Sequence, residues 1–130
     1  MGEIGPGWAI LLGVGAEDDD SAAATLVDQI VGLRAFEGTD GKMSLAAADV
    51  GAQFLVVSQI TLHADLSRGR RPSFSKAARP EIARPLIDRF VELLRERGFT
   101  VATGQFGAMM SVEIHNDGPV TMVLSTGGWS

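Results

Sequence analysis

Apolar residues occur along the chain in two spacings, as short continuous runs and as stripes that recur every three or four residues. Residues 8–14 form an apolar run between glycines, and residues 54–58 form a second run, so both predict buried strands. A stripe at helical spacing follows the acidic residues 18–20, whose carboxylates suit the positive end of a helix dipole. The first half therefore predicts a strand, a helix ending near residue 36, and a second strand.

The second half of the chain predicts one long helix and three strands. Residues 80–97 carry an apolar stripe with Gly98 as a stop, and Pro85 removes one backbone donor, which bends the early helix. Further strands are expected at 99–103, 110–115 and 120–124, and residues 59–62 are expected to continue the strand 54–58. The pattern favours one α+β domain spanning residues 1–130, a mostly antiparallel sheet or barrel with two packed helices.

Composition narrows the class of protein. The chain of 130 residues is 45% apolar and has no cysteine, which excludes disulfides and thiolate chemistry. No apolar run is long enough to span a membrane, and the first residues lack the features of a signal peptide. We expect a cytoplasmic protein with no membrane partner.

Charge is distributed unevenly. The net charge is −5, yet six of the eleven basic residues fall between Arg68 and Arg84, with Glu81 as the one acid among them. Two interpretations stay open from charge alone, a solvated loop and a local phosphate-binding face. The six basic residues are Arg68, Arg70, Arg71, Lys76, Arg79 and Arg84.

Two hydroxyl side chains, Ser58 and Thr61, follow the second buried run. His63 lies two residues after Thr61, so the two would share a face if the strand continued. A nucleophile also needs a base and a group that orients the base, and no Ser-His-Asp pattern is present. His63 and Asp65 have no third ligand by sequence, so we expect no metal and no cofactor.

The segment Asn116-Asp117-Gly118-Pro119 has two interpretations. It is typical of a turn between two strands. A Gly-Pro bond also permits the cis isomer, which would re-aim neighbouring carbonyls toward a substrate ammonium group.

Taken in order, seven short motifs resemble those of the D-aminoacyl-tRNA deacylase family over essentially the whole chain. They are Gly2-Glu3-Ile4-Gly5-Pro6-Gly7, Leu12-Gly13-Val14-Gly15, Gly41-Lys42-Met43, Ser58-Gln59-Ile60-Thr61-Leu62, Gly69-Arg70-Arg71-Pro72-Ser73-Phe74, Phe106-Gly107-Ala108 and Asn116-Asp117-Gly118-Pro119-Val120-Thr121. The resemblance implies hydrolysis of the ester of D-aminoacyl-tRNA. It also implies chiral proofreading, in which L-aminoacyl esters are rejected and glycine mischarged on tRNA-Ala is tolerated.

The resemblance also implies roles for single residues. Ser58, Gln59 and Thr61 match the active-site motif, in which backbone N–H groups near Gln59 stabilise the oxyanion while a ribose hydroxyl assists hydrolysis. The resemblance further implies a homodimer in which Gly118-Pro119 of one chain enters the partner's pocket. It also implies that Phe106 and Met110 line the site of the terminal adenosine. This chain departs from the family at Ile60, a pocket position where the family usually has Phe. We assign tRNA binding, and no DNA binding, to the cations Arg68, Arg70, Arg71 and Lys76.

The resemblance also implies that family members carry about 15 more residues before Gly2, which form the first strand and supply an arginine that braces the Gly-Pro loop. We therefore expect Met1 to be a misassigned start within a longer reading frame. If the chain instead begins at Met1, we expect the sheet to have an exposed edge. Two alternatives to the editing enzyme stay open at this point. They are a non-catalytic tRNA-binding module and a hydrolase of small esters.

Overall fold

The computed structural model describes residues 2–126. Its main sheet has three strands in the order β1-β4-β5, formed by Gly7–Leu12, Gln53–Ser58 and Val101–Thr103. Both neighbouring pairs are parallel, and the register places Leu12 beside Ser58 and Val56 beside Thr103. A small antiparallel pair, β2 (Phe36–Glu37) and β3 (Met43–Leu45), closes the turn at residues 38–41.

Two long helices account for the parallel pairing. α1 (Asp20–Gly32) connects β1 toward β4, and α3 (Pro80–Glu96) connects β4 to β5, with the short α2 (Ala47–Val50) before β4. A helical crossover returns the chain to the end where the previous strand began, so the next strand runs in the same direction. The α+β class with two packed helices is confirmed, but the expectation of mostly antiparallel strands is wrong for the main sheet.

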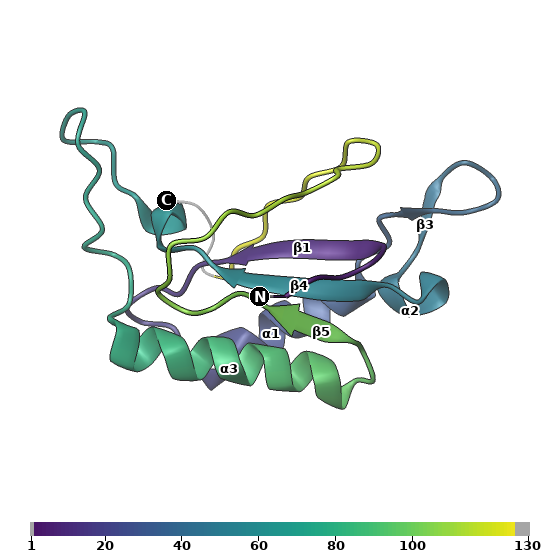
Figure 1. The fold of residues 1–130 in the computed structure, drawn as a ribbon, viewed down its shortest axis with the longest axis horizontal. Coiled ribbons are helices and arrows are strands. Elements are labelled where there is room, and N and C mark those ends of the chain that lie inside the picture. Colours follow the sequence, from purple (N-terminus) through teal and green to yellow (C-terminus); the bar gives the residue numbers. More distant parts are fainter. Residues whose placement is uncertain (1, 127–130) are drawn as a thin grey trace.

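Both helices lie together on one side of the sheet (Figure 1). The Asp19 side chain accepts a hydrogen bond from the Ala22 N–H at 3.0 Å and so caps α1. α3 stays helical through Pro85 and buries one stripe that includes Phe90 and Leu94. These side chains meet Phe54 and Val56 of β4, which makes the core a single layer between sheet and helices.

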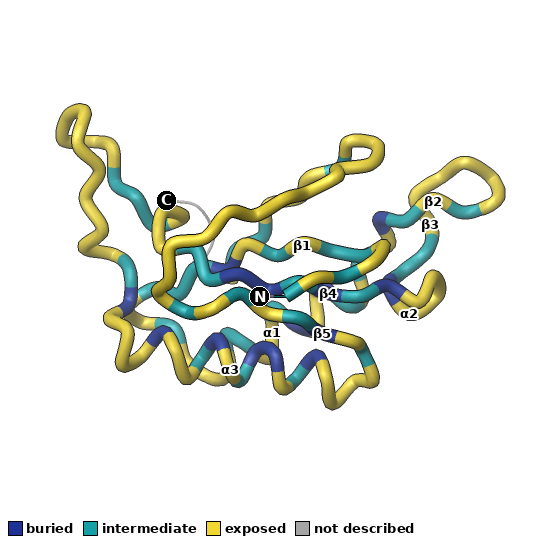
Figure 2. Tube along the Cα trace, viewed as in Figure 1, coloured by how far each residue is buried: buried dark blue, intermediate teal, exposed yellow. Residues whose placement is uncertain are grey.

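The segments after β5 differ from the prediction. Residues 110–115 and 120–124 were expected to be strands, but they form two extended arms without ladder pairing in the described residues. They are almost wholly exposed along their length (Figure 2). Alternation of apolar residues favours extended backbone, but strand pairing needs a partner at hydrogen-bonding distance, which a local pattern does not specify.

Candidate active site

The carboxyl ends of the parallel strands meet at one edge of the sheet, and Ser58 lies there as the last residue of β4. Residues that are two apart on a strand share a face, so Ser58 faces the same side as Phe54 and Val56. That side is covered by α3, which begins at this edge because it follows β4 in the chain and leads back to the start of β5. The sheet and helix thus frame Ser58 from two sides.

A cavity of about 730 Å³ lies between α3 and this edge. That volume falls in the general range of pockets that bind small molecules. The sheet side contributes Val56, Ser58, Thr103, Gly104, Gln105 and Phe106, and α3 contributes Arg84, Ile87, Asp88, Val91, Glu92, Arg95 and Glu96. The structure therefore brings together two predicted site residues that are far apart in sequence, Ser58 and Phe106.

The chain turns sharply after Ser58. The Gln59 N–H donates to the Leu12 carbonyl at 2.8 Å, and β1 then ends, so no ladder partner remains for the following residues. Ile60–His63 consequently form a 3₁₀ turn rather than the expected continuation of the strand. The Gln59 N–H therefore has an acceptor within the chain. The N–H groups of Ile60 and Thr61 are the first of the turn, and such groups have no carbonyl acceptor within the turn itself.

A nucleophile–base pair is absent from the described part of this site. The Ser58 hydroxyl has no hydrogen-bond partner among residues 2–126, and the Thr61 hydroxyl accepts from the Gln59 side-chain amide. Residues two apart in a 3₁₀ turn point in different directions, so Thr61 and His63 do not share a face. The His63 ring instead packs against the turn at Gly13 and Gly15, where an added Cβ would lie 3.1 Å and 3.4 Å from its carbons.

Two other predicted pocket residues, Met110 and Ile60, do not line this cavity. Met110 is 41% exposed, and its sulfur would lie 2.9 Å from a Cβ built on Gly104. Ile60 is 56% exposed and lines neither this cavity nor the wider groove described below. The single chain therefore places Phe106 in this cavity and Met110 in the wider groove, and it leaves Ile60 outside both.

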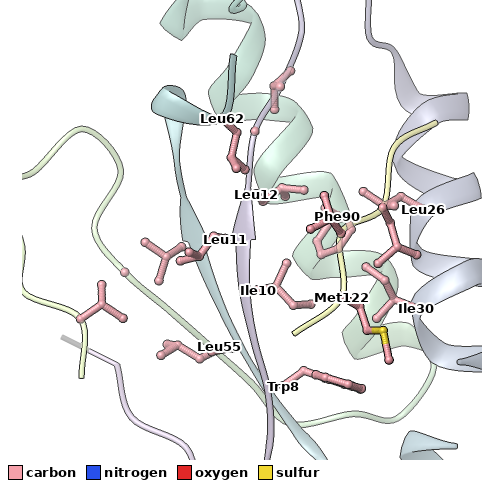
Figure 3. Close-up of a pocket in the computed structure, with 18 of the residues that line it drawn as sticks. Trp8, Ile10, Leu11, Leu12, Leu26, Ile30, Leu55, Leu62, Phe90 and Met122 are labelled. Atoms are coloured by element: carbon pink, nitrogen blue, oxygen red, sulfur yellow. The ribbon is translucent and has the colours of Figure 1, made fainter. Parts of the chain in front are cut away.

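A second, wider groove of about 2520 Å³ runs along β1 and the two arms. Figure 3 shows its apolar lining, with Leu11, Leu55 and Leu62 on one side of β1 and Ile10, Phe90 and Met122 on the other. The arms also leave apolar side chains on the surface, namely Val112, Ile114, Met122 and Val123, which are 37%, 51%, 43% and 70% exposed.

The predicted turn at residues 116–119 is confirmed. The Val120 N–H donates to Asn116 Oδ1 at 2.9 Å, and Asn116 Nδ2 donates to Thr121 Oγ1 at 3.0 Å. The Gly118-Pro119 peptide bond is cis, and both residues are exposed. The turn forms the tip that joins the arms and lies away from the Ser58 end of β4 (Figure 1). Asn116 and Asp117 line the wider groove, whereas Gly118 and Pro119 line neither cavity, so the structure does not bring the Gly-Pro pair to Ser58 of the same chain.

The basic segment forms a long loop before α3, and Arg68, Arg70, Arg71 and Lys76 are all exposed on it. Asp65 and Ser73 join its two sides through a pair of backbone hydrogen bonds of 2.7 Å and 3.0 Å. The Ser67 hydroxyl and then the Ser67 N–H lower the pKa of Asp65, and the charge of Lys76 acts in the same direction. The carboxylate at the base of the loop is therefore ionised at neutral pH.

Among residues 2–126, no group of three or more His, Cys, Asp or Glu side chains is arranged to hold a metal ion. Within the same part of the chain, no helix is both long and apolar enough to cross a membrane.

The fold and cavity define a small α+β protein whose candidate site offers a cavity in the size range of small-molecule pockets, with backbone donors nearby, but no nucleophile–base pair among the described residues. The profile of the D-Tyr-tRNA(Tyr) deacylase family matches residues 1–125, and the chain belongs to that family. The D-aminoacyl-tRNA deacylase of Symbiobacterium thermophilum is 52% identical over 126 residues, which cover 97% of this chain and 83% of the relative. The corresponding protein of Fervidobacterium nodosum is 49% identical, with 97% and 85% covered.

Solved structures agree with this fold. The c-Myc DNA Unwinding Element Binding Protein superposes with a TM-score of 0.87 at 38% identity, covering 95% of this chain and 84% of that chain. A probable eukaryotic D-amino acid tRNA deacylase superposes with a TM-score of 0.63 at 17% identity, covering 78% and 74%, which shows the fold alone.

Sequence reasoning missed the wall of the cavity that α3 provides. Arg84, Asp88 and Arg95 recur at helical spacing beside the buried residues Ile87 and Val91. That spacing places them on one flank of the helix. The signal was available in the sequence, but only the parallel pairing of β4 and β5 places this flank beside Ser58.

Proposed function

We propose that this chain hydrolyses the ester bond of D-aminoacyl-tRNA and releases the free D-amino acid and tRNA. The observation that carries the proposal is the 52% identity to a relative named D-aminoacyl-tRNA deacylase across 97% of the chain. The site is compatible with this chemistry because an aminoacyl ester is already activated and needs no strong side-chain nucleophile. The reaction takes place where tRNA is charged, in the cytoplasm.

The proposed mechanism uses backbone donors rather than a catalytic triad. Water attacks the ester carbonyl, the neighbouring ribose hydroxyl assists, and the departing ribose oxygen takes a proton. The N–H groups of Ile60 and Thr61 hold the oxyanion, since Gln59 already donates its own N–H to Leu12. Ser58 and the side chain of Gln59 position the ester at the end of β4.

The proposed active form is a homodimer in which the Gly118-Pro119 tip of one chain enters the site of its partner. The tip's exposure and its separation from its own Ser58 end support this arrangement (Figure 1). Exposed apolar residues on both arms supply a surface that a second copy could cover. The two carbonyls of the tip bind the α-amino group and leave no space for an L side chain. Glycine has no side chain to exclude, so Gly-tRNA-Ala is a secondary substrate.

The exposed basic loop is the proposed contact for the tRNA backbone. Its cations Arg68, Arg70 and Arg71 lie in the segment that leads directly into α3, at the same edge as Ser58. Lysine and arginine side chains that neutralise phosphates supply most of the non-specific affinity for nucleic acid. The local cluster of cations on this loop can therefore bind an RNA substrate even though the whole chain has a net charge of −5.

The proposal is tested by incubating purified protein with D-Tyr-tRNA, L-Tyr-tRNA and Gly-tRNA-Ala and measuring release of the amino acid. We expect release from the D-aminoacyl and glycyl substrates and none from L-Tyr-tRNA. Binding of tRNA without release would indicate a non-catalytic binding module. Equal release from both tyrosyl enantiomers would indicate an unselective esterase.

A further inference from the structure

Arg84 lies on the α3 wall of the cavity that also contains Ser58 and Phe106. It belongs to the second turn of a helix that begins at the carboxyl edge of the sheet. The later cavity residues of the same helix, Glu92 to Glu96, lie toward the opposite end, where β5 begins. Arg84 is therefore the arginine of this wall that is nearer to the Ser58 end.

The other charged groups on this wall mostly have partners. Arg95 donates to the Val101 carbonyl at 2.8 Å, and Arg89 contacts Glu92 at 3.0 Å and Glu96 at 3.6 Å. Arg84 has no ion pair or hydrogen bond within residues 2–126. Its guanidinium is thus available to an anion that enters the cavity.

Arg84 also continues the basic loop toward this cavity. Lys76, Arg79 and Arg84 follow one another along the chain with Glu81 as the one acid between them. A nucleic-acid strand that follows the loop would reach the cavity by way of Arg84. The planar guanidinium can bind a phosphate with two parallel hydrogen bonds, which a lysine cannot do.

We propose that Arg84 binds the 5′-phosphate of the substrate's terminal nucleotide, whose base lies against Phe106. This inference rests on the proposed function for the identity of the substrate. Phe106 and Arg84 line one cavity, so a base and its own phosphate can be held together. Asp88, one helical turn further, lines the same wall and opposes the phosphate by like charge. Arg84 and Asp88 together set the affinity for the nucleotide without taking part in ester cleavage.

The test compares the binding of adenosine, adenosine 5′-monophosphate and a short RNA ending in CCA to the full chain, by calorimetry or fluorescence anisotropy. For the unmodified protein we expect the monophosphate to bind about tenfold more tightly than adenosine, as for a charge-assisted hydrogen bond. Arg84→Gln should abolish that difference while leaving adenosine binding unchanged. For the RNA, Arg84→Gln should reduce the slope of log K against log salt by about 0.7. Asp88→Asn should tighten binding of both phosphate-bearing ligands.

Arg34→Gln is the matched control, because Arg34 is exposed and lines neither cavity but changes the net charge equally. The proposal would be overturned if Arg34→Gln weakened binding of the monophosphate as much as Arg84→Gln does. Equal affinity of the unmodified protein for adenosine and its monophosphate would also overturn it. Binding of the monophosphate but not of the RNA would overturn the assignment to a polynucleotide. These ligands carry no ester, so failure of the hydrolytic function is detected separately, by the release of amino acid from D-Tyr-tRNA.

Discussion

Gly118→Ala tests whether the shape of the exposed tip matters for catalysis. Gly118 has a φ of +132°, and a Cβ added there would lie 2.8 Å from Val120 Cγ2 and 3.1 Å from Val120 N. Backbone conformations of this kind cost a non-glycine residue on the order of 1–3 kcal/mol. If only the present conformation of the tip can enter the partner's site, the Gly118→Ala variant must bear that cost in each productive complex. Its kcat/KM should then fall by about 5- to 150-fold, since 1.36 kcal/mol equals a factor of ten.

The assay measures kcat/KM on D-Tyr-tRNA together with thermal unfolding. The tip is exposed and remote from the core, so we expect the free energy of unfolding to change by no more than about 0.5 kcal/mol. Gly51→Ala is the control, because Gly51 has a φ of +63° and open space around its Cβ position, and it lies at the end of α2. Retention of kcat/KM within about twofold by Gly118→Ala would refute the role of the tip. So would an equal loss in Gly51→Ala.

Three further predictions address the mechanism, the substrate and the core. Thr61→Ala should hydrolyse D-Tyr-tRNA at a rate close to that of the unmodified protein, whereas loss of about 10³-fold or more would identify Thr61 as a covalent nucleophile. The double variant Arg70→Glu/Arg71→Glu should raise KM for D-aminoacyl-tRNA about tenfold or more and leave hydrolysis of a D-aminoacyl adenosine unchanged. An equal loss of kcat/KM on both substrates would indicate damage to the active site and contradict a role in tRNA binding. Leu94→Ala should lower the free energy of unfolding by about 2–5 kcal/mol, because Leu94 is 0% exposed. Ile82→Ala, which removes a 45% exposed side chain from the same helix, should cost much less in a denaturant titration, and equal costs would contradict the proposed core.

The sequence was informative where structure depends on neighbouring residues. Periodicity predicted α3 as residues 80–97, one residue longer than observed, and the apolar runs predicted β1 and β4 to within a few residues. The predicted helix after residue 20 was too long, because it ends at Gly32, a poor helix former. The turn at Asn116 was predicted from residue types that favour it.

Pairing between distant segments was not available from the sequence. The parallel order β1-β4-β5 depends on how α1 and α3 cross over, and the pattern of apolar residues is compatible with either strand direction. Ile60 to His63 contain residues typical of strands, yet they form a 3₁₀ turn because β1 ends at Leu12 and offers no further partner. For the same reason Ser58 and Phe106 could be named individually, whereas their shared cavity with Arg84 required the structure.

The central claim is that this chain cleaves aminoacyl esters according to the chirality of the amino acid. The most direct measurement is the ratio of kcat/KM for D-Tyr-tRNA to that for L-Tyr-tRNA with the purified protein. Exclusion of the L side chain, worth at least a few kcal/mol, predicts a ratio of about 10² or more. A ratio near one, or no release from D-Tyr-tRNA by folded protein, would contradict the account.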